Sequence, residues 1–326
     1  MTTAEALAAF TRIREAAETY MEDMDAVDLG WSEETVTDVC VHKGHPTVRV
    51  SKFNKNQEGG GVGADYLWWW LDRSSGVCFG MLVQAKRLTH EGTKWKLDIR
   101  HNNGKQYSDL LKTAAQLEVP AMYGVYTGGP TFRTGLPCIH AKQPECVGCR
   151  RLAISMITAF QLSPIFSPAD TAETLFDESI SLEDLVDPRR SVGPVNDLNL
   201  QGIPPGDLRD FLLKPQVGPR EVAKRIFRLV SHARLGAFSA PSAQLIAVPG
   251  APLFPDVPDD RGHFPASYFR HILQGLRHSP PRYVEELLER QLFQDLLDGA
   301  LESVAGDVPV PAALDGLVDG IVLVSL

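Results

Sequence analysis

Three polar side chains, Asp65, Gln84 and Lys86, border two apolar runs and are of the types needed for metal-assisted phosphodiester hydrolysis. Mg²⁺ prefers oxygen ligands and usually keeps several waters. Asp65 would supply a charged ligand, Gln84 a neutral one, and the carbonyl of Ala85 a third. The Lys86 ammonium would orient or activate the attacking water and offset negative charge in the transition state. An alternative stays open, in which these residues form a buried sheet end with a simple Lys–Asp pair.

These side chains can act together only if the two apolar runs form a hairpin. Residues 66–71 are aromatic and apolar, residues 77–83 are apolar throughout, and residues 73–76 (RSSG) separate them. Runs rich in aromatic and β-branched residues around a short Ser/Gly turn predict a β-hairpin. Both faces of both runs are apolar, which indicates central strands that are covered on both sides.

The register of this hairpin decides whether the polar residues meet. If the turn is centred between Ser74 and Ser75, residues whose numbers add up to 149 face each other, and Asp65 lies opposite Gln84. Directly opposed residues share a face of the sheet, and so do residues two apart on one strand. Asp65, Gln84 and Lys86 are therefore expected to converge at the open end. A slip of one residue would move one arm to the other face.

The pattern GAD-x18-QAK resembles the PD-(D/E)XK, or restriction-endonuclease-like, nuclease superfamily. It is most similar to the Mrr-like branch, which tolerates Gln in place of the acid before x-Lys. The wider pattern, EET at 33–35 followed by GADYLWWW, VQAKRL and PAMYGVY, also resembles an uncharacterised bacterial group of such domains. The resemblance covers roughly residues 30–160. Two departures are Gly63-Ala64, where the founding pattern has Pro, and Gln84, which removes one negative ligand and leaves weakened or lost activity open.

The resemblance implies an α/β fold, a restriction-endonuclease-like mixed sheet flanked by helices, with the element order α, β, β, β, α, β. It implies an acid from the first core helix at the metal site, and Glu33 and Glu34 open that helix behind the N-cap Ser32. We favour Glu34, although acids in a first turn also simply stabilise the helix dipole. A Gln or Lys at the start of the next core helix often touches substrate or water in related domains, which selects Gln106.

The segments around the hairpin supply the other elements of this order. Residues 47–53 alternate apolar and polar residues and predict a strand, and residues 104–117 predict a helix. Residues 121–127 predict a short strand that pairs parallel to the Gln84 strand after this helical crossover. Residues 150–160 look like a buried helix. The apolar end of the chain is expected to return to a sheet as a strand.

Composition and charge limit the classes of protein to which this chain can belong. A chain of 326 residues that is 44% hydrophobic and 22% charged is typical of a soluble globular protein. It has no apolar run of membrane-spanning length and no N-terminal signal-peptide pattern, so we expect a cytoplasmic protein without a membrane partner. The net charge of −9 argues against a protein that coats DNA generally.

One segment is nevertheless locally basic, and a phosphate backbone could lie along it. A solvated surface is an equally open interpretation. We call this segment, from Gln84 to Lys112, the basic strip. Against the three acids Glu91, Asp98 and Asp109, its basic residues are Lys86, Arg87, Lys94, Lys96, Arg100, Lys105 and Lys112. Within and beside it, Arg87, Lys105 and Gln106 are the residues we expect to contact substrate.

A second metal pattern follows the core. Cys138, His140, Cys146 and Cys149 form C-x-H-x5-C-x2-C, and thiolates with an imidazole at such spacings could bind structural Zn²⁺. The alternative is a set of reduced cysteines packed at the start of a helix.

The chain divides into three predicted regions. These are an N-terminal helix in residues 1–30, a nuclease-like core in residues 31–162 and a mainly helical region in residues 163–326. The last region contains predicted helices at 208–213, 221–235, 267–276 and 283–297. We expect it to serve in interaction or regulation, through a homo-oligomer or a partner protein.

Together these features predict an endonuclease that depends on Mg²⁺ or Mn²⁺, with DNA as the expected substrate and RNA still open. The resemblance implies a bacterial restriction or anti-phage role. One alternative is a nuclease-like fold that has lost catalysis and serves as a nucleic-acid-binding or scaffold module. The other is a zinc-stabilised protein-interaction module dominated by the helical half.

Overall fold

The predicted hairpin lies at the centre of a large mixed sheet. The computed structural model describes residues 3–53, 64–91, 94–133, 147–159, 161–162, 167–190, 193, 206–237, 268–298 and 310–326. Strand β2 (Tyr66–Leu71) pairs antiparallel with β3 (Cys78–Arg87), with Tyr66 opposite Val83 and Leu71 opposite Cys78. The numbers in each pair add up to 149, so the predicted register is confirmed.

The sheet draws strands from both halves of the chain. Its order is β1-β10-β2-β3-β6-β7-β8, and the short β9 pairs with β3. The bounds are β1 Val48–Lys52, β6 Ala121–Tyr126, β7 Ile154–Thr158, β8 Ile180–Ser181, β9 Leu276–Arg277 and β10 Gly320–Ser325. Strand β6 runs parallel to β3, as predicted. Strand β10 inserts between β1 and β2, antiparallel to the first and parallel to the second, so the chain end does return to the sheet. A separate ribbon is formed by β4 (Thr89–Glu91) and β5 (Lys94–Lys96).

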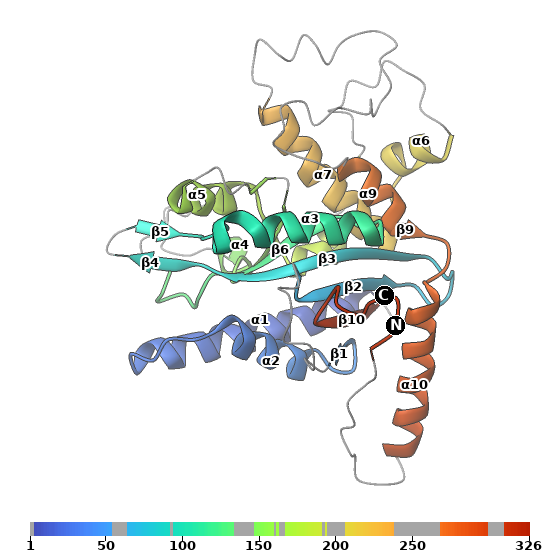
Figure 1. Cartoon of the computed structure of the whole chain (residues 1–326), viewed down its shortest axis with the longest axis horizontal. Helices are drawn as coiled ribbons and strands as arrows, with labels where there is room; N and C mark the ends of the chain where they lie inside the picture. Colours follow the sequence, from blue (N-terminus) through green and yellow to red (C-terminus); the bar gives the residue numbers. More distant parts are fainter. Residues whose placement is uncertain are drawn as a thin grey trace.

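Helices cover both faces of the central strands. The α-helices are α1 Thr3–Ala26, α2 Glu33–Gly44, α3 Lys105–Leu117, α4 Val147–Arg151, α5 Pro168–Glu178, α6 Gly206–Leu213, α7 Pro219–Ala237, α9 Tyr268–Gly275 and α10 Arg282–Asp298. Short 3₁₀ turns are η1 His101–Gly104, η2 Glu183–Leu185 and η3 Pro188–Arg190. Figure 1 shows α1 and α2 on one side of β2 and β3, and α3 on the other. In the described ranges, no helix has both the length and the apolar character that crossing a membrane requires.

The order α2, β1, β2, β3, α3, β6 matches the predicted order α, β, β, β, α, β. The protein is therefore α/β, with a mixed sheet flanked by helices and a mainly helical C-terminal region, as predicted. Helix α2 begins at the predicted cap: Ser32 accepts a hydrogen bond from the Thr35 amide at 3.2 Å.

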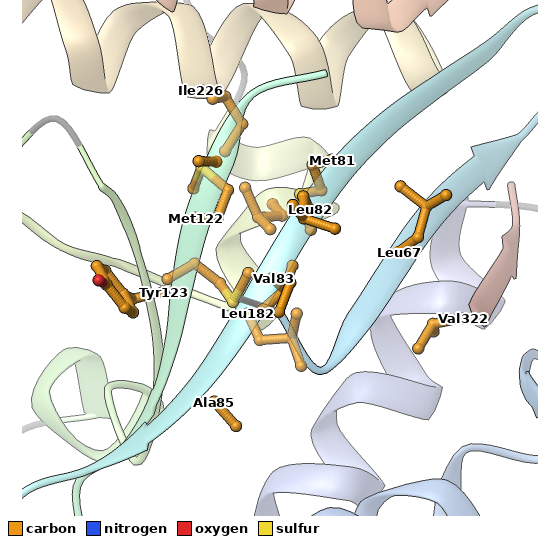
Figure 2. Close-up of a cluster of buried hydrophobic side chains, with 14 of the residues drawn as sticks. Leu67, Met81, Leu82, Val83, Ala85, Met122, Tyr123, Leu182, Ile226 and Val322 are labelled. Atoms are coloured by element: carbon orange, nitrogen blue, oxygen red, sulfur yellow. The ribbon is translucent and has the colours of Figure 1, made fainter. Parts of the chain in front are cut away.

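The core lies around the central strands (Figure 2). Trp69 and Trp70 are fully buried, so most of the aromatic run packs inside the protein, as expected. Helix α7 lays its predicted apolar side against the sheet, since Val222, Ile226 and Val230 are all buried. The helical C-terminal region and the central sheet thus share one hydrophobic core.

The helix predicted for residues 150–160 is wrong. Helix α4 ends at Arg151, and Ile154–Thr158 form strand β7, which pairs antiparallel with β6. Short apolar runs have no periodicity that separates a buried helix from a buried strand. Here the β-branched residues Ile154, Ile157 and Thr158 and the free edge of β6 favour the strand.

We predict that Gly320→Ala destabilises the protein, because β10 approaches its neighbours too closely for a side chain. A Cβ atom at Gly320 would lie 2.7 Å from the Ser51 carbonyl oxygen and 2.9 Å from Cε1 of Tyr66. The Ser51 oxygen belongs to the strand ladder and cannot move freely, so the expected loss is about 1–3 kcal/mol in the free energy of unfolding. Urea unfolding measures it, and Gly30→Ala is the control because a Cβ atom there meets nothing within 4 Å. Equal stability of the two variants would contradict this packing.

Candidate functional site

The site begins with a carboxylate held at the open end of the central hairpin. Asp65 directly precedes β2 and lies opposite Gln84, as the register requires. The Gln84 Nε2 donates to Oδ2 of Asp65 at 2.7 Å, and the Ala85 amide donates to the same oxygen at 2.7 Å. The structure therefore brings together the first two residues of the predicted trio.

Burial controls the charge of this carboxylate. It raises the pKa of Asp65 from 3.8 to about 6. The hydrogen bonds from Ala85 and Gln84 act in the opposite direction, while the nearby charges of Asp319 and Glu33 raise the pKa further. Asp65 is thus poised to lose its proton near neutral pH, and a positive partner would stabilise the charged form.

Gln84 leaves one polar atom unsatisfied. The residue is 3% exposed, and its Oε1 has no hydrogen-bond partner among the described residues. A buried acceptor without a partner costs about 1–3 kcal/mol. The same carboxamide bonds Asp65 through Nε2 and approaches the carbonyl of Ala85 at 3.4 Å. All three proposed oxygen donors, from Asp65, Gln84 and Ala85, therefore lie within one small group of atoms.

Lys86 is also buried, and helix α3 fixes its ammonium. Its Nζ donates to Oε1 of Gln106 at 2.7 Å. Gln106 stands in the first turn of α3, which begins directly after Gly104. Gly104 has φ +81°, a left-handed conformation that glycine adopts without strain. The predicted substrate residue Gln106 is thus placed at the site, where it holds Lys86.

The start of α2 supplies a further acid. The carboxylate of Glu33 accepts a hydrogen bond from the Arg87 amide at 2.9 Å, at the end of β3. Burial raises the pKa of Glu33, and the positive charge of Lys86 partly offsets this effect. Glu34, the residue favoured from the sequence, is exposed, so of these two acids it is Glu33 that bonds the end of β3.

Two residues expected to contact substrate are engaged elsewhere. The guanidinium of Arg87 lies 5.7 Å from the centre of the Trp31 ring and donates to the Trp31 carbonyl. Lys105 pairs with Asp109 on the surface of α3 at 2.7 Å. In the basic strip Lys96 likewise pairs with Glu91. Exposed pairs of this kind contribute little to stability.

The predicted zinc pattern falls mostly outside the described residues. Cys138, His140 and Cys146 are not among them, while Cys149 is a half-buried free cysteine in α4. Within the described part of the chain, no group of three or more His, Cys, Asp or Glu side chains could hold a metal ion by itself. A cation at Asp65 would therefore need amide and carbonyl oxygens as well as carboxylates.

The sequence interpretation missed one residue of this neighbourhood. Asp319 directly precedes β10, and its amide donates to the Asp65 carbonyl at 3.1 Å. The sequence shows an acid before an apolar run at the chain end. It does not show which strand this run pairs with, because the pairing joins segments from opposite ends of the chain.

These features define an α/β protein with a part-buried carboxylate, a buried carboxamide and a buried ammonium at the end of its central hairpin. A family model described as "Family of unknown function (DUF6615)" matches residues 2–310, so the chain belongs to that family. Comparison with curated proteins and with solved structures gives no match. The chemistry of the site must therefore be derived from its own residues.

Asp65 gives the free energy of unfolding a pH dependence of defined sign. Between its ordinary pKa of 3.8 and its folded-state pKa of about 6, the native state binds more protons than the unfolded state. The Asp65 contribution to stability therefore falls as the pH rises through this range. Asp65→Asn should remove that loss. The free energy of unfolding of the variant, relative to that of the native protein, should therefore increase by roughly 1–3 kcal/mol from about pH 4.5 to about pH 7.5.

Asp72→Asn is the matched control for this measurement. Hydrogen bonds from Ser74 and Ser75 lower the pKa of Asp72 to about 2. Its stabilising contribution is therefore complete above the ordinary pKa and is lost only in stronger acid. Urea unfolding should show the same Asp72→Asn effect at both pH values. An Asp65→Asn effect that is also independent of pH would contradict the raised pKa.

Proposed function

We propose that this protein is a metal-dependent nuclease that hydrolyses phosphodiester bonds, with DNA as its substrate. The observation that carries the proposal is the arrangement of Asp65, Gln84 and Lys86 at the open end of the central hairpin. The order α2, β1, β2, β3, α3, β6 supports it, because this is the order implied by the resemblance to PD-(D/E)XK nucleases.

The donor atoms suit a hard divalent cation. Asp65 offers a carboxylate, and Gln84 offers a buried Oε1 that has no partner among the described residues. The carbonyl of Ala85 lies beside that carboxamide. Oxygen donors with few charges are typical of Mg²⁺ sites that also retain waters. A bound Mg²⁺ or Mn²⁺ would stabilise negative charge on the phosphate and lower the pKa of a coordinated water.

The other residues would position the reacting groups. Gln106 holds the Lys86 ammonium through the 2.7 Å hydrogen bond, on the same face of β3 as Gln84. From there Lys86 would bind the attacking water or a phosphate oxygen and offset the charge that develops in the transition state. Glu33 fixes the end of β3 by binding the Arg87 amide, and it lies close enough to Lys86 for the two charges to interact.

A substrate with a phosphate backbone fits the local charge better than the overall charge. The net charge of −9 would repel nucleic acid at long range. The basic strip instead offers exposed cations at Lys94, Lys105 and Lys112, and Lys105 directly precedes Gln106, which bonds to Lys86. Binding is therefore expected to be local and to weaken as salt concentration increases.

A specific observation favours a second candidate, a nuclease-like module that binds nucleic acid without cutting it. Gln84 is neutral, and its Nε2 donates to Asp65, so the carboxylate has a partner without any cation. A site with fewer negative ligands binds a divalent cation more weakly. In this alternative the basic strip would still bind a phosphate backbone.

Cleavage of plasmid DNA in Mg²⁺ or Mn²⁺ tests the main proposal. Asp65→Asn and Lys86→Met should each lower the cleavage rate at least about 100-fold, because each removes a group that acts on the metal or the transition state. Lys214→Met is the matched control, since this lysine lies outside the basic strip, is 66% exposed and pairs with Asp210 at 2.7 Å. Cleavage that persists in both site variants would contradict the assignment of Asp65 and Lys86 to the active site. DNA binding without any cleavage by the native protein would favour the second candidate.

The Gln84→Glu variant further distinguishes the nuclease from the module that binds nucleic acid without cutting it. The new carboxylate adds a charged ligand, so Mn²⁺ should bind more tightly and should raise the unfolding temperature more than in the native protein. Without metal the variant should be less stable, because it places like charges together near Asp65 and loses the Nε2 hydrogen bond. Calorimetry with and without MnCl₂ measures both effects. Unchanged Mn²⁺ affinity would show that Gln84 does not contribute to a cation site.

A further inference from the structure

We infer that Asp319, from the C-terminal strand β10, is a second carboxylate ligand of the divalent cation at Asp65 and Gln84. This inference rests on the proposed function and deepens it, because it identifies a metal ligand from outside the central hairpin. It concerns a residue that the GAD-x18-QAK pattern does not include.

Backbone pairing places Asp319 directly beside Asp65. Gly320 pairs with Tyr66 in the parallel ladder of β10 and β2. One step earlier, the Asp319 amide donates to the Asp65 carbonyl at 3.1 Å. On the other side, the Phe53 amide donates to the Asp319 carbonyl at 2.8 Å. The backbone of Asp319 is therefore fixed between β1 and β2, at the same level of the sheet as Asp65.

The alternation of side chains puts the two carboxylates on one face. Tyr66 and Val322 both line an apolar cavity against α1 and α2. Neighbouring residues on a strand point to opposite faces. Asp65, next to Tyr66, and Asp319, three residues before Val322, therefore both face away from that cavity.

Gln84 and Lys86 face the same way. Their neighbours Val83 and Ala85 line the cavity, so Gln84 and Lys86 point to the opposite side of β3. The bond from Lys86 to Gln106 of α3 agrees with this direction, because α3 covers the face away from α1 and α2 (Figure 1). Asp319, Asp65 and Gln84 thus form a continuous row across three adjacent strands.

The strand pairing and the buried carboxamide together indicate that this row holds a cation. Asp319 and Asp65 lie side by side on adjacent strands and face the same way, so their negative charges repel each other. The 3% exposed carboxamide of Gln84, which bonds to Asp65, has an Oε1 without a partner among the described residues. A divalent cation in this row would relieve the repulsion. With the carboxamide of Gln84 turned over, so that Oε1 takes the place of the Nε2 that now faces Asp65, the cation would also satisfy the amide oxygen.

The consequence concerns the neutral residue of the trio. Gln84 is neutral, so the hairpin by itself supplies only one charged ligand, Asp65. Asp319 would restore the second negative charge from an adjacent strand. The insertion of β10 between β1 and β2 is the feature that brings Asp319 close enough to supply this charge.

Binding of Mn²⁺ to the full-length protein, measured by isothermal titration calorimetry with MnCl₂ alone, tests the inference. Asp319→Asn and Asp65→Asn should each weaken binding at least about tenfold. Asp319→Glu keeps the negative charge and should weaken binding less than Asp319→Asn. Asp315→Asn is the matched control, because Asp315 is an exposed acid just before the same strand, and it should bind Mn²⁺ as the native protein does.

Measuring stability in the absence of metal distinguishes a metal-ligand role of Asp319 from a structural role. Asp319→Asn removes one of two repelling carboxylates, so in EDTA it should unfold at the same or a higher urea concentration than the native protein. Failure of this variant to fold, while Asp319→Glu folds and binds Mn²⁺ like the native protein, would identify a structural role and overturn the inference.

The outcomes distinguish this inference from the proposed function. Native affinity in Asp319→Asn together with weakened binding in Asp65→Asn would overturn the role of Asp319 and leave the nuclease proposal standing. Mn²⁺ binding that depends on Asp319 in a protein that cleaves no DNA or RNA would support the ligand and contradict the nuclease. A native protein that binds no Mn²⁺ would overturn the inference.

Discussion

The antiparallel pairing of β2 with β3 is the constraint on which the candidate site depends. Because Tyr66 faces Val83, the next residues outward, Asp65 and Gln84, face each other at hydrogen-bond distance. Both faces of these strands are buried and apolar, so hydrophobic burial alone does not specify the register. The turn does specify it: Asp72 accepts hydrogen bonds from the hydroxyl groups of Ser74 and Ser75 and so fixes which residues begin the return strand.

Several polar groups at the site lie in positions where they do not stabilise the fold. Asp65 and Glu33 both have pKa values raised by burial, and Gln84 has a buried oxygen without a partner in the described residues. Strongly perturbed groups that gather in one place are typical of functional sites. A divalent cation would stabilise the charged carboxylates and bind the amide oxygen. The same residues in a purely structural sheet end would be more stable as apolar side chains.

Much of the fold could be predicted from local patterns, and the errors have physical causes. The hairpin and the crossover through α3 follow from short-range pairing and turn chemistry. The strand β7 was mistaken for a helix because a five-residue apolar run carries no periodicity. The choice between Glu33 and Glu34 depends on how α2 is rotated against the sheet, since successive helical residues point in directions about 100° apart. Asp319 joins the site through a pairing between distant segments, which no local pattern contains.

Belonging to a family of unknown function leaves the chemistry to be tested at the site itself. The most direct test is a crystal structure of the protein with Mn²⁺ and a short DNA duplex, in which anomalous scattering locates the metal. We expect an anomalous peak at a metal bound to the Asp65 carboxylate and next to a DNA phosphate, with Lys86 beside that phosphate. A DNA complex with no peak at Asp65, or with the metal bound elsewhere, would contradict it.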